Sequence, residues 1–424
     1  MITVFKKRQS KIGYIFFFIL IISFLPSCTP SPVLTPTPTE SAFILPETAT
    51  PSPSLPECTS IEAAPTPAAS EGSLFPPVND SDMARGDENA TVTLIEYGDF
   101  QDPPSAAFAA VLAELAEKYP EELQIVFRDF PLYTNLSHEK ATFAAHATHA
   151  AALQGKYWEM HDSLFEKQAE WSPLSIKDFQ TWLADEATWL GIDATQLAED
   201  MEREEIIEKV KESFIKATEI SVPGTPFVLI NGQIYTGLLN FDSLDQIIAL
   251  IALGERQFTS CPPLVIDPEK EYLAILETEK GEITIQFSPQ QAPVAVNNFI
   301  FLAREGWFDG ITFHRVLSGF FAESGDPSGT GQGNPGYFVR DEIDSTLSFD
   351  RPGVVAMKSV GGDTNGSQFF ITFEAAPSYD GNYTIFGQVL SGMDVLKEIS
   401  PRDPQFGETL PPGDTLLHVT IEER

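Results

Sequence analysis

The chain has 424 residues, enough for one to three domains, and its apolar content of 42% is sufficient for ordinary globular cores. It carries 61 acidic and 26 basic residues, so its formal net charge is −35. Nucleic-acid binding requires a basic surface, and this charge therefore disfavours a nucleic-acid partner. The three cysteines, Cys28, Cys58 and Cys261, form no Cys-x-x-Cys pair, which leaves a zinc ribbon or a dithiol centre unsupported.

Residues 1–28 have the pattern of an export signal. Four basic residues precede an apolar run, Ile12–Leu25, whose length of about 14 residues is short for a membrane span and typical of a signal-peptide core. The run ends at the sequence Leu-Pro-Ser-Cys28, which resembles a bacterial lipobox, in which the cysteine is lipidated. We therefore expect an extracytoplasmic protein that is anchored to the bacterial cell membrane by a lipid at Cys28. An uncleaved anchor and a plain secretion signal are the alternatives.

Residues 29–80 are rich in proline, threonine, serine and alanine and show no sustained apolar period. A segment of this composition cannot bury a core. We therefore interpret it as a semi-extended stalk that precedes the first folded domain.

Residues 81–255 alternate between strand and helix patterns. In chain order, we predict a strand at Thr91–Tyr97, a helix at Pro103–Tyr119, a strand at Leu123–Phe127, a helical region at about 137–218, a hairpin at 226–238 and a helix at Phe241–Leu253. This order resembles the thioredoxin-like α/β domain of the disulfide oxidoreductase (DsbA-like) family, with its helical insertion. The segments FRDFPL (127–132) and VPGTP (222–226) support the resemblance, and the second corresponds to the family's cis-proline loop.

The redox pair of that family is missing from this sequence. Asp102 and Ser105 stand at the two cysteine positions, and thiol–disulfide exchange requires a thiolate at the attacking one. Asp102 remains a good N-cap for a helix that has Pro103 at its first position. We therefore expect a redox-silent domain. It is either a peptide-docking surface around Asp102, Ser105 and Pro226 or a spacer that only keeps its fold.

Three histidines of the helical region, His146, His149 and His161, invite comparison with a metal site. The first two share a helix face, but no carboxylate or cysteine stands in ligand register with them. We interpret the three as packing or surface residues, and we expect neither a metal nor a cofactor.

Residues 256–267 form a linker, because Pro262 and Pro263 end the preceding helix. Cys261 lies in this linker, and Cys58 lies in the stalk. In an oxidising compartment, the two cysteines that remain after lipidation of Cys28 are expected to form a disulfide. Two free or differently bonded thiols are the alternative.

Residues 268–424 are rich in strand patterns and punctuated by glycine. We predict a hairpin at Glu271–Phe287, a helix at Pro293–Glu305, short strands, and a second helix at Met393–Ile399. Four segments resemble, in order and spacing, the cyclophilin family of peptidyl-prolyl cis-trans isomerases: FHRVLSGFFAESGD (313–326), NGSQFF (365–370), DGNYTIFG (380–387) and GMDVL (392–396). The resemblance implies an all-β, eight-stranded antiparallel barrel that is capped by two helices.

The same resemblance implies which residues carry the function. Arg315 corresponds to the catalytic guanidinium, and Gln368 to an amide that contacts the substrate backbone. The substrate-binding positions are Phe320, Phe321, Glu323, Phe370, Tyr379 and Tyr383. Rotation about an X-Pro bond has a barrier of ~18–20 kcal/mol and requires no covalent step or metal. An apolar pocket for the proline ring and a fixed donor for the twisted imide lower this barrier.

Glu323 replaces a glutamine that is common in the family. Its carboxylate either pulls the Arg315 guanidinium away from the substrate or orients it through a charge-assisted bond, and we expect reduced activity. His314 precedes Arg315, but strand alternation points it to the opposite face. We therefore interpret His314 as a packed structural residue and not as a general base.

The sequence thus predicts an exported prolyl isomerase that acts on unfolded or proline-containing exported polypeptides and assists their folding. A peptide-binding chaperone without turnover is the second hypothesis. Thiol–disulfide exchange is the third, and the residues at positions 102 and 105 argue against it.

Overall fold

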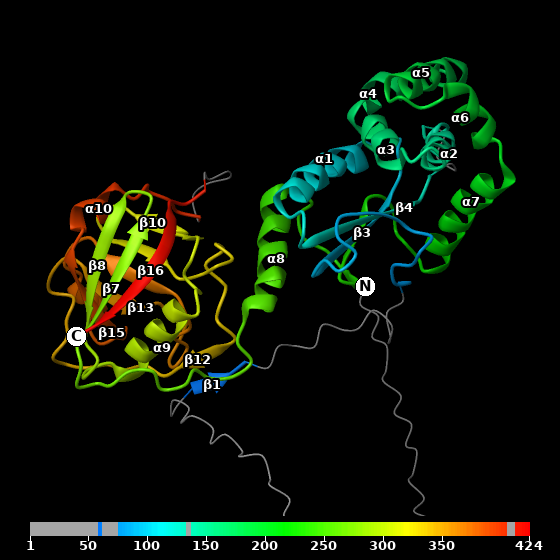
Figure 1. Cartoon of the computed structure of the whole chain (residues 1–424). Helices are drawn as coiled ribbons and strands as arrows, with labels where there is room; N and C mark the ends of the chain where they lie inside the picture. The colour runs from blue at the N-terminus through cyan, green and yellow to red at the C-terminus, as the bar shows by residue number, and fades with distance from the viewer. Residues whose placement is uncertain (1–57, 62–74, 133–136, 405–411) are drawn as a thin grey trace, which may run out of the picture. The chain divides into compact units, whose positions relative to one another are not determined.

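The computed structural model describes residues 58–61, 75–132, 137–404 and 412–424 (Figure 1). The predicted signal peptide, the lipidation site Cys28 and most of the predicted stalk lie outside these residues. Within the described ranges, no helix is both long enough and apolar enough to cross a membrane.

A first sheet lies between residues 83 and 234 and has, in the described chain, five strands in the order β2-β4-β3-β5-β6. These strands are β2 (Met83–Arg85), β3 (Val92–Gly98), β4 (Leu123–Asp129), β5 (Phe227–Ile230) and β6 (Gln233–Ile234). β3 and β4 pair in parallel, and the other neighbours are antiparallel. A parallel pair needs a crossover connection, and helix α1 (Pro103–Lys118) supplies it.

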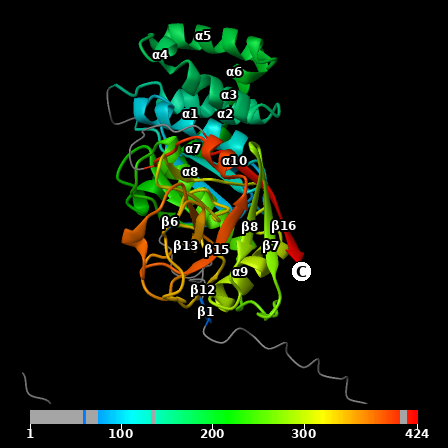
Figure 2. The ribbon, with the colours of Figure 1, turned by 90° about the vertical axis from the view of Figure 1, so that its left-hand side faces the viewer.

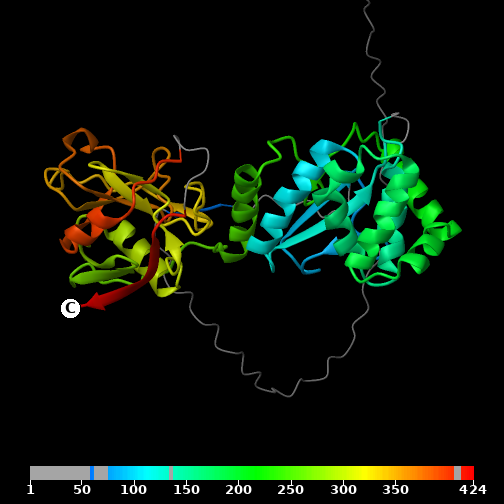
Figure 3. The same ribbon diagram turned by 90° about the horizontal axis from the view of Figure 1, so that it is seen from above.

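Helices cover both faces of this first sheet (Figure 3). On one face, α1 and α8 (Phe241–Leu253) pack against Val92 and Leu94 of β3. On the opposite face, Ile95 and Tyr97 pack with α7 (Glu204–Glu219). Since β3 is buried on both sides, it shows the nearly continuous apolar sequence that predicted it. The helical region predicted at 137–218 contains, in its described part, α2 (Ala141–Ala152), α3 (Tyr157–Glu166), α4 (Gln168–Trp171), α5 (Ile176–Trp189), α6 (Ala194–Met201) and α7.

A second sheet has, among the described residues, nine strands in the order β10-β11-β14-β13-β15-β8-β7-β16-β9. They are β7 (Tyr272–Thr278), β8 (Gly281–Phe287), β9 (Ile311–Thr312), β10 (Arg315–Leu317), β11 (Phe321–Ser324), β13 (Val354–Met357), β14 (Phe369–Thr372), β15 (Ile385–Ser391) and β16 (Thr415–Glu423). Figure 2 shows β13, β15, β8, β7 and β16 side by side in that order.

This second sheet curls into a half-barrel. β9 and β10 follow each other in the chain, yet they lie at opposite ends of the strand order, so the two edges of the sheet approach each other at Phe313 and His314. The resemblance implied eight strands. The described residues show nine because Phe313 and His314 interrupt one strand and leave the short pieces β9 and β10.

The two faces of the curled sheet carry different apolar clusters. Phe369 and Ile371 of β14 face the main core, where Phe299 and Ile300 of α9 (Pro293–Arg304) and a leucine of α10 (Met393–Glu398) pack. Phe370, between them in the sequence, belongs to a second, smaller cluster. Because side chains alternate along a strand, this second cluster lies on the face that α9 does not cover.

Two segments that we predicted as stalk pack against folded parts of the chain. Residues 58–60 form β1, which pairs antiparallel with β12 (Tyr337–Val339), and Cys58 is joined to Cys261 by a disulfide. Phe75 is buried. Arg128 donates hydrogen bonds to the carbonyl oxygens of Pro76 and Pro77, the two residues after Phe75. The disulfide confirms the pairing of Cys58 and Cys261 that we predicted. The composition of the segment could not reveal the other contacts, because each depends on a partner far away in the sequence.

Candidate active site

One row of the curled sheet brings together three residues that the sequence analysis selected. Arg315 of β10 stands opposite Glu323 of β11, and Glu323 stands opposite Phe370 of β14. Residues that lie directly opposite each other in antiparallel strands project from the same face. The register therefore places a guanidinium, a carboxylate and an aromatic ring in one line on the face that carries the smaller apolar cluster.

The apolar part of this face is an aromatic cluster, which we define as Phe321, Phe349, Phe370, Tyr379 and Tyr383. The Phe370 ring is its centre, with ring centroids at 5.8 Å from Phe321, 5.9 Å from Phe349, 6.1 Å from Tyr379 and 5.2 Å from Tyr383. Both tyrosine rings meet it edge to face, which is a favourable aromatic geometry. The cluster gives the site an apolar surface of fixed shape.

Arg315 lies against this aromatic cluster. Its Cζ is 5.2 Å from the centroid of the Phe321 ring, within cation–π range. Two carboxylates flank the guanidinium, with Glu323 Oε1 3.7 Å from Nη1 and Asp403 Oδ1 3.6 Å from Nε. Since the Arg315 side chain is 26% exposed, the cation remains accessible from solvent while its orientation is constrained.

Glu323 is a buried carboxylate within a network of charges. Burial raises its pKa above the usual range; the charges of Lys358 and Arg315 lower this pKa, and the charge of Asp403 raises it. The Lys358 ammonium also approaches Oε1 of Gln368, at 3.4 Å. The site therefore holds two cations, Arg315 and Lys358, and two carboxyl groups, Glu323 and Asp403. The net charge of the site depends on whether Glu323 is ionised.

Gln368 lies just before β14, where its side chain is held by the glycine-rich loop opposite. Its Nε2 donates a hydrogen bond to the carbonyl oxygen of Gly333 at 2.8 Å. The amide borders a pocket of about 250 Å³ whose lining includes Lys358, Phe338 and Val360. Gln368 is thus fixed at the border of this pocket, two residues before Phe370 of the aromatic cluster.

Phe320 differs from the expectation that it lines the pocket. Its side chain is 64% exposed and does not join the aromatic cluster, whereas Phe321 is buried in it. Gly319 has a φ of +77° and forms the turn before β11, so the alternation that begins with the strand selects Phe321 for the cluster. His314 is buried, and burial lowers its pKa, which fits the structural role that we predicted for it.

Three residues of the site were missed by the sequence analysis: Phe349, Lys358 and Asp403. Phe349 stacks on Phe370 from a loop without a recognisable pattern, at an interplanar angle of 6°. Lys358 follows β13 by one residue, so the alternation of that strand could have suggested it. No local signal points to Asp403.

The positions that replace the redox cysteines lie at the N-terminus of α1. Asp102 caps the helix, as predicted, and its Oδ2 accepts hydrogen bonds from Ser105 N at 3.2 Å, Ser105 Oγ at 3.0 Å and Thr225 Oγ1 at 3.0 Å. The peptide bond between Thr225 and Pro226 is cis. The structure therefore brings Asp102, Ser105 and the Pro226 loop together, with the carboxylate engaged in hydrogen bonds.

Glu96 lies on β3 in the same part of the fold and is completely buried. Neither of its carboxylate oxygens has a hydrogen-bond partner in the described part of the chain. Burial raises the pKa of Glu96 to about 8, and the charge of Asp102 adds to this effect. Glu96 is therefore mainly protonated at neutral pH.

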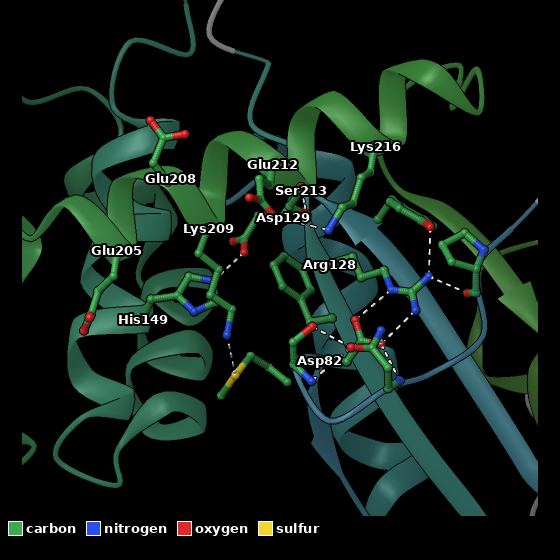
Figure 4. A pocket seen from close by; sticks show the side chains of 16 residues that line it. Asp82, Arg128, Asp129, His149, Glu205, Glu208, Lys209, Glu212, Ser213 and Lys216 are labelled. Atoms are coloured by element: carbon green, nitrogen blue, oxygen red, sulfur yellow. Dashed lines mark hydrogen bonds and ion pairs between the residues drawn. The ribbon is translucent and has the colours of Figure 1, made fainter.

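A pocket of about 440 Å³ lies between α7, β4 and the start of β2 (Figure 4). Arg128 is held there by Asp82, at 2.9 and 2.8 Å, and by the Tyr97 hydroxyl at 2.9 Å. Asp129 and His149 form a second buried pair at 2.6 Å. The described residues contain no group of three or more histidine, cysteine or acidic side chains arranged to hold a metal ion. These polar groups mainly bind one another and thereby fix the N-terminal segment of the domain.

Comparison with known proteins agrees with the cyclophilin resemblance and with the thioredoxin-like character of the first domain. The family of cyclophilin type peptidyl-prolyl cis-trans isomerases matches residues 273–421, and a thioredoxin family matches residues 78–249. A peptidyl-prolyl cis-trans isomerase of Helicobacter pylori is 41% identical over 136 residues, which are 32% of this chain and 83% of that protein. The mouse peptidylprolyl isomerase domain and WD repeat-containing protein 1 is 44% identical over 130 residues.

The match to the mouse protein covers 30% of this chain and 20% of that relative, so the chain spans about a fifth of its length. Among solved structures, a cyclophilin type peptidyl-prolyl cis-trans isomerase of Cryptosporidium parvum is similar, with 32% identity and a TM-score of 0.33. That match covers 36% of this chain and 98% of the other. Beside its thioredoxin-like domain, the chain belongs, through residues 273–421, to the cyclophilin type peptidyl-prolyl cis-trans isomerase family.

Proposed function

We propose that residues 268–424 catalyse the cis–trans isomerisation of X-Pro bonds in exported polypeptides. The observation that carries the proposal is the position of the Arg315 guanidinium, 5.2 Å from the Phe321 ring, on the face of the sheet that carries the aromatic cluster. An apolar surface beside a fixed cation suits a proline ring and its imide. Few other ligands would fit it equally well.

The mechanism requires only positioning and electrostatics. The aromatic cluster binds the proline ring and removes water from the imide, which disfavours the charge-separated planar form. When the bond is twisted, the imide nitrogen regains its lone pair, and Arg315 donates a hydrogen bond to it. Gln368 fixes the backbone that precedes the proline. These interactions are stronger in the twisted state than in either planar state, so they lower a barrier of ~18–20 kcal/mol.

Glu323 attenuates this activity. Its ionised carboxylate lies 3.7 Å from Nη1 of Arg315 and competes with the substrate for the same cation. When Glu323 is protonated, it is a neutral group, as the glutamine of other family members is, and Arg315 is freed. We therefore expect an isomerase whose rate rises as the pH falls through the raised pKa of Glu323.

The rest of the chain supports an extracytoplasmic location. The signal-like pattern of residues 1–28, the lipobox-like sequence at Cys28 and the disulfide between Cys58 and Cys261 all suit an exported lipoprotein. The thioredoxin-like domain lacks a thiol at positions 102 and 105, so it is redox-silent. It either docks extended polypeptides beside Pro226 or serves as a spacer.

An isomerase assay on the wild type and on Arg315→Ala tests the proposal. A protease-coupled or NMR assay on an X-Pro peptide should show turnover that falls by about 10²–10³-fold in the variant, the effect of losing one preorganised donor. Arg424→Ala, which removes an exposed arginine, is the matched control and should not change the rate. If wild type and Arg315→Ala are equally slow, the enzyme hypothesis is wrong.

Peptide binding without turnover is the second candidate, and the two carboxylates around Arg315 favour it. The same assay separates the two functions, because a binding module would retain a proline peptide and leave its exchange rate unchanged. Reduction of insulin disulfides should remain at the background rate, in agreement with the missing thiols.

A further inference from the structure

The segment that follows α10 places an acidic residue next to Arg315. Val316 and Arg402 exchange both backbone hydrogen bonds, at 2.6 and 2.9 Å, in an antiparallel bridge. Arg402 Nε also donates to the carbonyl oxygen of His314 at 3.2 Å. In antiparallel pairing, the residues next to such a doubly bonded pair also stand opposite each other, with their side chains closer together. Arg315 and Asp403 are that next pair.

The guanidinium of Arg315 is therefore flanked by carboxylates from two different neighbours. Asp403 Oδ1 lies 3.6 Å from Nε, and Glu323 Oε1 lies 3.7 Å from Nη1. Coulomb attraction varies inversely with distance, so at these separations the two pulls are comparable and act on different edges of the group. Together they hold the guanidinium over the Phe321 ring.

We infer that Asp403 is a positioning residue for the isomerisation: it opposes the pull of Glu323 and so keeps Arg315 over the aromatic cluster. This inference rests on the proposed function of Arg315. Without Asp403, Glu323 would be the one remaining carboxylate that the described residues pair with the cation, and Arg315 would close onto it and away from the proline site. Asp403 forms an ion pair with Arg315 and is not a member of the aromatic cluster, so it acts through the arginine.

The charges that face Glu323 give this role a distinctive signature. Arg315 faces it from β10, Lys358 from the end of β13, and Asp403 from the segment after α10. Asp403 is the acidic one of the three, and its charge raises the pKa of Glu323. Removing that charge must therefore move the ionisation of Glu323 to lower pH, an effect that a merely structural role would not produce.

The test compares wild type, Asp403→Asn, Asp403→Glu and a control, Glu422→Gln, as full chains. The control removes an acidic partner of an exposed arginine, Arg424, 2.8 Å away. NMR exchange spectroscopy on an X-Pro peptide gives kcat and KM from about pH 4.5 to 8 without a coupling protease. Asp403→Asn should lower kcat by about three- to tenfold, with KM within about twofold, and should move the midpoint of the pH profile to lower pH. Asp403→Glu should recover most of the kcat.

Several outcomes would overturn the inference. One is an unchanged kcat and midpoint in Asp403→Asn. Another is a lower kcat together with a lower melting temperature and an unmoved midpoint, because this pattern indicates only a structural role. If the wild type itself shows no turnover, the proposed function is wrong, and the Nε–H resonance of Arg315 then decides about Asp403. That resonance, assigned by its loss in Arg315→Lys, should shift in Asp403→Asn and not in Glu422→Gln; an unshifted resonance refutes the contact.

Discussion

Replacing Glu323 with glutamine tests how this carboxylate acts on Arg315. The two charged groups approach to 3.7 Å, between Oε1 and Nη1. At this distance, Coulomb's law gives about 4.5 kcal/mol at an effective dielectric constant of ~20 and about 1 kcal/mol in water. The Arg315 side chain is 26% exposed, so the attraction lies between these two limits.

Only part of this attraction energy affects the rate. It is the part that is lost when Arg315 moves from Glu323 to the twisted imide in the transition state. If that part is about 1 kcal/mol, Glu323→Gln raises kcat/KM about fivefold at neutral pH. Burial raises the pKa of Glu323, so the carboxyl becomes neutral as the pH falls through this raised value. The kcat/KM of the wild type should then rise towards that of Glu323→Gln. The kcat/KM of the variant should not change over this pH range, because its residue 323 does not ionise.

The measurement is kcat/KM on one X-Pro peptide between about pH 4.5 and 8, for wild type, Glu323→Gln and the control Glu422→Gln. A variant that is equal to or slower than the wild type at every pH would refute the reasoning. It would show that the carboxylate orients the arginine through a charge-assisted bond, and that the ionised form is the active one.

Two further predictions concern buried charge. Lys358 lowers the pKa of Glu323, so Lys358→Gln should move the midpoint of the pH profile of kcat/KM to higher pH. The control Lys397→Gln, on the exposed side of α10, should leave the midpoint unchanged. A shift to lower pH in Lys358→Gln would contradict the charge network. Glu96 has a pKa of about 8 in the folded state, whereas the ordinary pKa of a glutamate is 4.5, so the fold binds a proton that the unfolded chain releases. This contributes stability that is fully present below pH 4.5 and is lost as the pH rises through 8, on the order of 5 kcal/mol in total. Glu96→Gln should remove that pH dependence in urea unfolding followed by tryptophan fluorescence, and an unchanged dependence would show that Glu96 is ionised in the fold.

Elements with local signals could be predicted closely from the sequence. The helix predicted at Phe241–Leu253 has these bounds as α8, and the Asn240 side chain caps its first turn. α1 begins at Pro103 because Asp102 accepts the hydrogen bond of an orphan N–H group. Arg315 and Phe370 were selected by the resemblance, and two-residue alternation along β10, β11 and β14 places them on one face of the sheet. Phe320 escaped this rule because it lies in the turn and not in the strand.

The remainder of the candidate site depends on where the chain returns in space. Asp403 follows Arg315 by 88 positions and reaches it only because Arg402 closes a bridge onto the edge of β10 that β11 leaves open. No composition or period near position 403 marks it, and the same is true of Phe349 in its loop. A resemblance transfers the residues that a family shares, whereas the ionisation of Glu323 is set by Lys358 and Asp403, which the motifs did not include. The rate of this isomerase is therefore expected to depend on residues whose importance only the three-dimensional structure reveals.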